Sequence, residues 1–91
     1  MAKKIFKYPI QVTDTQKVKM PALAEILTAQ FQEGYGLCLW ALVDPEMDVE
    51  EKTIVIYGTG HSTDLHDMNY NYIGTVQERN GALVWHVFEL L

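Results

Sequence analysis

Apolar residues in this chain occur in short runs that turn residues interrupt at intervals of roughly eight to twelve positions. The runs are rich in Val, Ile, Tyr, Phe and Trp, which is typical of β-strands. We therefore predict an all-β fold with at most one short helix, a small and mostly antiparallel β-sandwich or barrel of about six or seven strands. No repeat and no Pro/Gly/Ser linker interrupts the pattern, so residues 1–91 are expected to form a single domain.

The N-terminal half contains one ambiguity between strand and helix. Residues 3–10 alternate, with Phe6 and Tyr8 on the same side, which predicts a strand. The apolar spacing in residues 23–32 fits either a helix or a strand. A short glycine-containing connection at residues 33–36 and the apolar run after it favour a β-hairpin for this region.

Two predicted strands are apolar on both faces. One is the run LCLWALV at residues 37–43, and the other follows Asn80-Gly81, a pair that predicts a two-residue type I′ turn. On this last strand Leu83, Trp85 and Val87 are expected to point to one face, and Val84, His86 and Phe88 to the other. Both faces are largely apolar. Strands of this kind are covered on both sides, by their own chain or by another subunit, so we expect a homo-oligomer.

Charge and cysteine content narrow the class of protein. Seven basic and twelve acidic residues give a formal net charge of −5, which opposes direct nucleic-acid binding, because phosphate neutralisation supplies most of that affinity. Cys38 is the only cysteine and lies among apolar neighbours, which predicts a buried, inert thiol. We find no signal-peptide pattern and no apolar run long enough to span a membrane, so a cytoplasmic protein without membrane contact is expected.

The segment DPEMDVEE at residues 44–51 carries five carboxylates in eight residues. Its alternating acids resemble a calcium loop, but Val49 stands where the sharp turn of such a loop requires glycine. We therefore predict a solvated acidic loop without a metal ion. Its carboxylates at Asp48, Glu50 and Glu51 are candidate contacts for a basic partner surface.

No set of side chains has the spacing of an established catalytic motif. Cys38 and His86 would form a nucleophilic pair only if the thiol were polarised and exposed. The loop HSTDLHD brings together potential metal ligands, namely His61, Asp64, His66 and Asp67, but matches no standard zinc spacing. We predict a protein that is not an enzyme and has no cofactor, with a metal-dependent hydrolase centred on His61, His66 and Asp67 as the open exception. His86 is expected to be a core or interface histidine whose ring nitrogens find backbone or side-chain partners.

The turn GTGH has two interpretations. Gly58 and Gly60 permit positive φ angles, so the backbone N–H groups could form an anion-binding nest, with Thr59 and His61 as further donors. The simpler interpretation is a turn that ends a strand. Gly58, Thr59, Gly60 and His61 are therefore candidate ligand-binding residues.

Five motifs, in order along the chain, resemble a family of small uncharacterised bacteriophage and prophage proteins: KYP, LWALVDP, YGTGH, YIGT and GALVWHVFE. That family is a domain of unknown function, so the resemblance assigns no role to any residue. It implies a phage-type protein acting in the cytoplasm of a host cell. Small phage proteins without catalytic groups commonly act by binding, and this association is the basis of the functional expectations.

These observations give three expectations for function. The first is sequestration of a host small molecule, such as a nucleotide defence signal. The second is inhibition of a host enzyme by binding it through the acidic segment. The third is a structural or assembly role in a virion.

Overall fold

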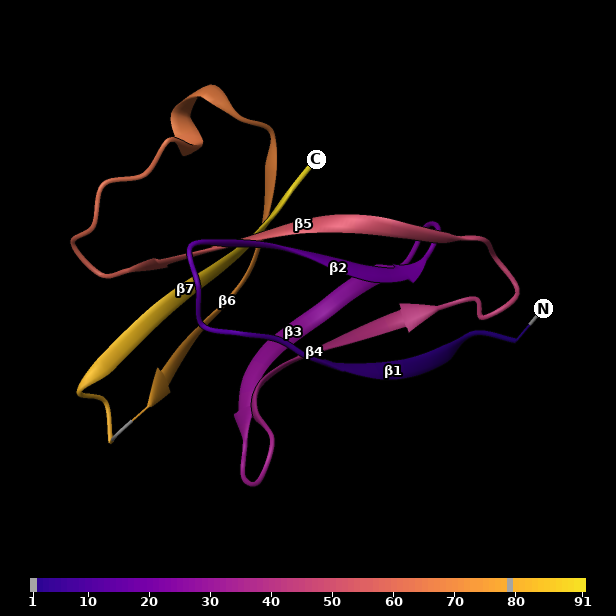
Figure 1. Cartoon of the computed structure of the whole chain (residues 1–91), viewed down its shortest axis with the longest axis horizontal. Helices are drawn as coiled ribbons and strands as arrows, with labels where there is room; N and C mark the ends of the chain where they lie inside the picture. The colour runs from indigo at the N-terminus through magenta and orange to yellow at the C-terminus, as the bar shows by residue number, and fades with distance from the viewer. Residues whose placement is uncertain (1, 79) are drawn as a thin grey trace.

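The computed structural model of the chain describes residues 2–78 and 80–91 (Figure 1). This part forms an all-β sandwich of two antiparallel sheets, as predicted. One sheet has the order β1-β4-β3 and the other the order β2-β5-β7-β6. The strands are β1 (Lys4–Pro9), β2 (Thr15–Pro21), β3 (Glu25–Gln32), β4 (Gly36–Val43), β5 (Val49–Gly58), β6 (Tyr70–Glu78) and β7 (Leu83–Leu90). A single 3-10 turn, η1 (Leu65–Asp67), precedes β6, and no described helix is long and apolar enough to cross a membrane.

Most of the ambiguous segment 23–32 is a strand and not a helix, since residues 25–32 form β3 and residues 23–24 belong to the preceding turn. β3 pairs with β4 through a tight connection in which the N–H of Tyr35 donates to the carbonyl of Gln32 at 3.0 Å. The glycines that predicted the hairpin adopt positive φ, 86° at Gly34 and 83° at Gly36. Pairing with the apolar β4 along residues 25–32 satisfies the backbone groups on one side of β3, with a register shift between Ile26 and Thr28.

The core lies between the inner faces of the two sheets. The first sheet contributes Leu37, Leu39, Ala41 and Val43 of β4, and the second contributes Ile54, Ile56 and Val87. β4 is central in its sheet, as predicted, and the alternation of β1 is confirmed because Tyr8 packs against the core. At one edge of the sandwich β3 lies beside β6, and Gly74 of β6 approaches the backbone of Ala29.

Two strand boundaries differ from the sequence predictions, and one predicted turn is described only in part. The acidic segment is a loop only as far as Asp48, because β5 begins at Val49, where it pairs with Pro21 at the end of β2. The polar stretch of residues 62–71, whose composition predicts a loop, ends earlier than this prediction, since β6 starts at Tyr70. Positive φ is confirmed at Asn80 (56°) and Gly81 (87°), but the predicted two-residue turn would be closed by Arg79, which lies outside the described residues.

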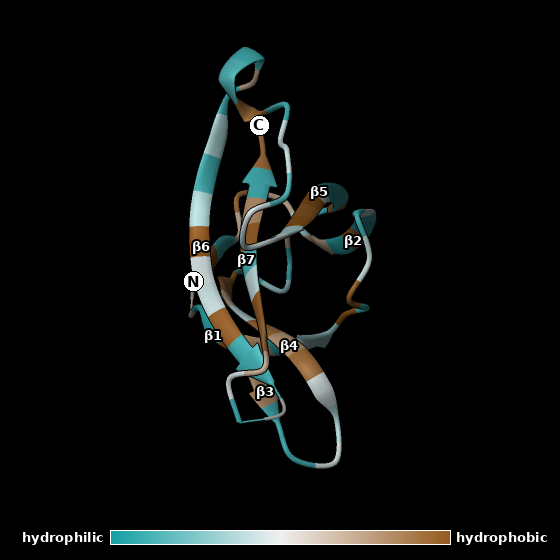
Figure 2. Cartoon of the chain, turned by 90° about the vertical axis from the view of Figure 1, so that its left-hand side faces the viewer, coloured by the Kyte–Doolittle hydropathy of each residue, from teal (hydrophilic) through white to brown (hydrophobic). Residues whose placement is uncertain are grey.

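The connection from β5 to β6 is a crossover. Both strands run antiparallel to β7, which lies between them, so β5 and β6 are parallel to each other. Residues 59–69 must therefore return along the length of the sheet, and they form the wide arc at the upper left of Figure 1. Figure 2 shows that this crossover segment is largely hydrophilic, while β5 and β7 contain hydrophobic stretches.

Candidate functional site

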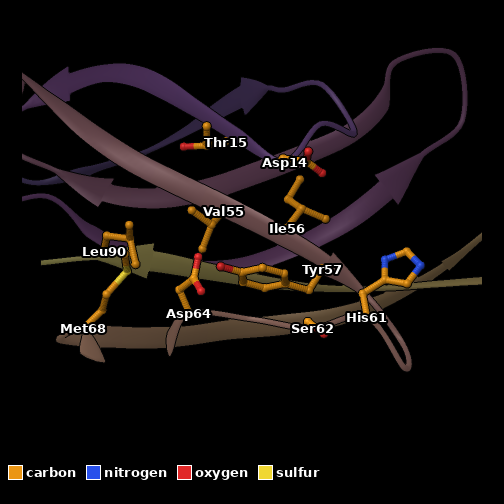
Figure 3. A pocket seen from close by; sticks show the side chains of 10 residues that line it. All are labelled: Asp14, Thr15, Val55, Ile56, Tyr57, His61, Ser62, Asp64, Met68 and Leu90. Atoms are coloured by element: carbon orange, nitrogen blue, oxygen red, sulfur yellow. The ribbon is translucent and has the colours of Figure 1, made fainter. Parts of the chain in front are cut away.

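The crossover segment and the outer face of β5 enclose an open hollow of about 460 Å³ (Figure 3). Its apolar side chains are Val55, Ile56, Met68 and Leu90, and the Tyr57 ring adds an aromatic wall. Its polar side chains are Asp14, Thr15, His61, Ser62 and Asp64. Among the residues that the structure describes, no lysine or arginine lines the hollow. The volume suits a small organic molecule, but the two aspartates disfavour an anionic one.

The GTGH motif forms a compact turn at the end of β5. The N–H of His61 donates to the carbonyl of Gly58 at 3.1 Å, and the N–H of Thr59 donates to Val84 at 3.4 Å. Gly60 has a φ of 88°, the conformation that the glycine permits. Two of the N–H groups that an anion nest would need are thus already bonded within the chain.

The absent side chain of Gly58 positions the His61 ring. A Cβ atom at position 58 would lie 2.7 Å from Cε1 of His61, inside van der Waals contact. The ring therefore occupies space that any other residue at position 58 would fill. His61 borders the large hollow and also two smaller ones beside Trp85.

The close contact between Gly58 and the His61 ring predicts the effect of the substitution Gly58→Ala. The new methyl group is expected to displace the His61 ring, while the free energy of unfolding changes by less than about 1 kcal/mol, since an exposed side chain can rotate away. The measurement is the pair of His61 ring resonances in a ¹H–¹³C NMR spectrum, with His66 as the internal control because its ring lies elsewhere in the crossover segment. Unmoved His61 resonances would contradict the arrangement.

His86 is held by a chain of hydroxyl groups on the outer face of the four-stranded sheet. Its Nε2 lies 2.7 Å from Oγ1 of Thr59, and its Nδ1 lies 3.0 Å from Oγ1 of Thr75. Thr75 in turn lies 2.6 Å from the hydroxyl of Tyr72. The prediction that both ring nitrogens find partners is confirmed, although His86 is half-buried and not a core residue. The bond to Thr59 fastens the crossover segment to β7.

An aromatic cluster lies beside this chain of hydroxyls. Phe88 of β7 is surrounded by the rings of Tyr57, Tyr70 and Tyr72, with centroid distances of 6.2, 5.4 and 5.5 Å. Sequence reasoning missed the cluster, because its members come from three strands. A signal was present: Tyr70 and Tyr72 are two residues apart and so point to the same side of a strand.

The opposite end of the molecule is an acidic tip, formed by the turn of residues 21–24 and the segment 44–51. The N–H of Ala22 donates to the carbonyl of Asp48 at 2.7 Å and joins the two parts. Asp44 shapes the loop by accepting the N–H of Glu46 at 3.1 Å. Three apolar side chains are exposed here among the carboxylates: Leu23, Met47 and Val49.

The candidate partner-binding carboxylates occupy different positions in the tip. Asp48 lies in the loop next to the 21–24 turn, whereas Glu50 and Glu51 belong to β5 and alternate in direction. Glu51 stands opposite Lys19 of β2, so a positive charge already neighbours it. Asp48 and Glu50 are therefore the carboxylates of this set that are best placed for an external partner.

Leu23 is the unusual residue of the tip. It is 84% exposed and has a φ of 64°, the left-handed region in which leucine is disfavoured. The N–H of Ala24 donates to the carbonyl of Pro21 at 3.3 Å, so Leu23 occupies the third position of a β-turn, where positive φ calls for glycine or asparagine. No sequence signal predicted this conformation.

The catalytic candidates are not brought together. Cys38 belongs to the three-stranded sheet and His86 to the four-stranded one, and the register places each on the outer face of its sheet. His61 and Asp64 border the hollow, while His66 and Asp67 contact each other at 3.1 Å on an exposed turn. Among the described residues, no group of three or more His, Cys, Asp or Glu side chains could hold a metal ion.

Comparison with curated proteins and with solved structures finds no match. A family model matches the whole chain, residues 1–91. The chain therefore belongs to the DUF7352 family, which is described as a domain of unknown function.

Proposed function

We propose that this protein is a non-enzymatic binding protein, of phage or prophage type, that docks on a host protein through its acidic tip. The observation that carries the proposal is Leu23, an exposed leucine in a left-handed conformation at the centre of the tip. Phage origin rests on the sequence resemblance alone.

Neither conformation nor solvation within this chain favours a leucine at position 23. The left-handed conformation costs about 1 kcal/mol for a residue with a side chain, and glycine or asparagine would avoid most of it. The exposed apolar side chain gains nothing from burial in the free protein. Strained residues of this kind cluster at binding sites, where the surroundings hold a side chain in position for a ligand.

The surroundings of Leu23 indicate the chemistry of the partner. Exposed Met47 and Val49 enlarge the apolar contact, and the carboxylates of residues 44–51 surround it. A complementary surface has an apolar pocket bordered by lysine or arginine side chains. Apolar anchors would supply most of the affinity, and the charges would raise the association rate at low ionic strength.

Replacing Leu23 by asparagine is expected to raise the folding stability and to weaken partner binding, so the two effects can be measured separately. Asparagine tolerates positive φ, so the free energy of unfolding is expected to rise by up to about 1 kcal/mol. Loss of an anchor side chain is expected to weaken partner binding by about 30-fold or more. The partner is isolated on the immobilised wild-type protein from a host extract, and its affinity for each purified variant is then measured by calorimetry.

The matched control is Val12→Ser, which removes an exposed apolar side chain from the β1–β2 loop at the other end of the sandwich (Figure 1). This variant should keep the wild-type affinity. Neutralising Asp48 and Glu50 together should slow association and reduce its dependence on salt. A partner that binds Leu23→Asn as tightly as wild type would refute docking through the tip.

The hollow beside Tyr57 supports small-molecule binding as a second candidate function. Its two aspartates and its lack of described cations favour a neutral or cationic ligand over the nucleotide-type ligand expected from the sequence. A thermal-shift panel of nucleotides, sugars and amines compares anionic ligands with neutral and cationic ones. A stabilising compound should lose its effect in Tyr57→Ala but not in Leu23→Asn, and a panel without any shift would remove this candidate.

A further inference from the structure

A second hollow, of about 440 Å³, opens between the two sheets and is bordered by the start of β3 and the start of β6. We name it the inter-sheet hollow. Lys52 and Glu89 border it, and Asn71 stands opposite Glu89 in the strand register. Glu89 also stands opposite Ile54, a core residue that is 0% exposed, so these side chains lie on the inner face of the four-stranded sheet. Lys52 precedes Ile54 by two residues on β5 and therefore shares this face.

The ion pair between Lys52 and Glu89 leaves part of its hydrogen-bonding capacity unused. The ammonium of Lys52 has three donors and makes one hydrogen bond to the described residues, to Oε2 of Glu89 at 2.9 Å. The other carboxylate oxygen of Glu89, Oε1, has no hydrogen-bond partner in the part of the chain that the structure describes. No buried side-chain oxygen or nitrogen of that part lacks a partner, so Oε1 is accessible although Glu89 is only 7% exposed. Because Glu89 borders the inter-sheet hollow, a molecule in the hollow can reach this oxygen.

Folding stability alone does not explain why the chain has this ion pair. The loss of hydration of two buried charges offsets most of their attraction, so well-packed apolar residues in their place are often equally stable. Ligand sites, in contrast, combine apolar walls with a few converging polar groups. The apolar walls of the inter-sheet hollow include Ile26 and Ile73, which pack against the core. The hollow therefore has the composition and the volume of a site for a small organic molecule.

The charges of the ion pair define which ligand would fit. The pair is neutral as a whole, so a purely anionic or purely cationic ligand meets one favourable and one unfavourable charge. A zwitterion satisfies both, because its carboxylate can accept from the Lys52 ammonium while its own ammonium donates to Oε1 of Glu89. Glu25 also borders the hollow, but it stands opposite Leu42, on the outer face of its sheet. The inward-facing charges are therefore one cation and one anion.

We propose that the inter-sheet hollow binds a free α-amino acid with an apolar side chain. Lys52 and Glu89 hold its two charged groups, and its side chain lies against Ile26 and Ile73. The ion pair itself stays intact, since the ligand uses the remaining donors of the ammonium and the second carboxylate oxygen. This site differs from the hollow beside Tyr57, and it does not depend on docking through the acidic tip.

Leucine and two analogues that each lack one charge test the proposed chemistry. A ¹H–¹⁵N NMR titration of the wild-type protein follows the backbone amides of Lys52, Asn71 and Glu89. Leucine should shift these amides and bind at least about tenfold more tightly than isoamylamine, which has no carboxylate, or isocaproic acid, which has no ammonium. Equal binding of either analogue would overturn recognition of a zwitterion. Unshifted amides up to a leucine concentration on the order of 10 mM would overturn the site.

Substitution of the whole ion pair tests its role in binding. The double variant Lys52→Met with Glu89→Leu retains no buried charge, so it should fold but bind leucine at least about tenfold more weakly. Tyr57→Ala is the matched control, since it alters only the other hollow, and it should keep the wild-type affinity for leucine.

Intermolecular nuclear Overhauser effects locate the ligand on the wild-type protein without any substitution. The methyl groups of bound leucine should show them to the methyl groups of Ile26 and Ile73. Undiminished binding by the double variant, or contacts of leucine with another part of the wild-type protein, would refute the proposal.

Discussion

Replacing Leu39 by alanine is expected to lower the free energy of unfolding by about 2 to 5 kcal/mol. Leu39 is 0% exposed at the centre of β4, where it meets residues from both sheets. The substitution removes buried methyl groups and leaves a cavity that a rigid two-sheet core can close only partly. Urea denaturation monitored by circular dichroism measures the change as a shift of the midpoint at constant slope.

The matched control for this prediction is Leu27→Ala, the same deletion on the neighbouring strand. Leu27 is the bulged residue of β3 and is exposed, so its loss should change the free energy of unfolding by no more than about 0.5 kcal/mol. Equal effects of the two substitutions would mean that the core does not lie where the structure places it.

The second large effect is expected at the ion pair between Lys52 and Glu89. The two side chains are 20% and 9% exposed, and Nζ lies 2.9 Å from Oε2. Lys52→Met leaves the buried carboxylate without its cation and should destabilise the protein by about 3 kcal/mol, as when one partner of a buried pair is removed. Thermal and urea unfolding at neutral pH measure the loss.

A double-mutant cycle distinguishes the contribution of the ion pair to stability from that of side-chain packing. In Lys52→Met with Glu89→Leu no buried charge remains, so most of the lost stability should return. Glu89→Leu alone should cost less than Lys52→Met, because the freed ammonium can extend into water. Simple additivity of the two single substitutions would show that the ion pair contributes nothing specific.

The fold was predictable to the extent that it depends on local periodicity. The alternation of β1, the two-faced β4 and β7, and the glycine-rich β3–β4 connection each follow from residues within one or two strands. The helix–strand ambiguity of residues 23–32 was resolved by β4, a partner outside the segment. The start of β5 at Val49 was likewise set by pairing with β2, although the acidic composition had suggested a loop.

The candidate sites were less predictable, because their residues meet only through strand order. Gly58–His61 was correctly singled out as a turn, but the contact between the His61 ring and Gly58 depends on how the turn closes. The aromatic cluster joins strands β5, β6 and β7. Leu23 has a positive φ in a turn that the N–H of Ala22 joins to the carbonyl of Asp48. Apart from the spacing of Tyr70 and Tyr72, these features have no signature within a window of neighbouring residues.

The sequence by itself determined that this protein is all-β, which residues alternate on each strand, and that Cys38 is buried and the ring nitrogens of His86 are bonded. These properties follow from side-chain period and polarity, which act over a few residues. Only the tertiary structure decided which faces are inner and outer, that the crossover segment borders a hollow, and that an exposed leucine stands among carboxylates. Strand order and register set these features, because they bring together residues that the sequence keeps far apart.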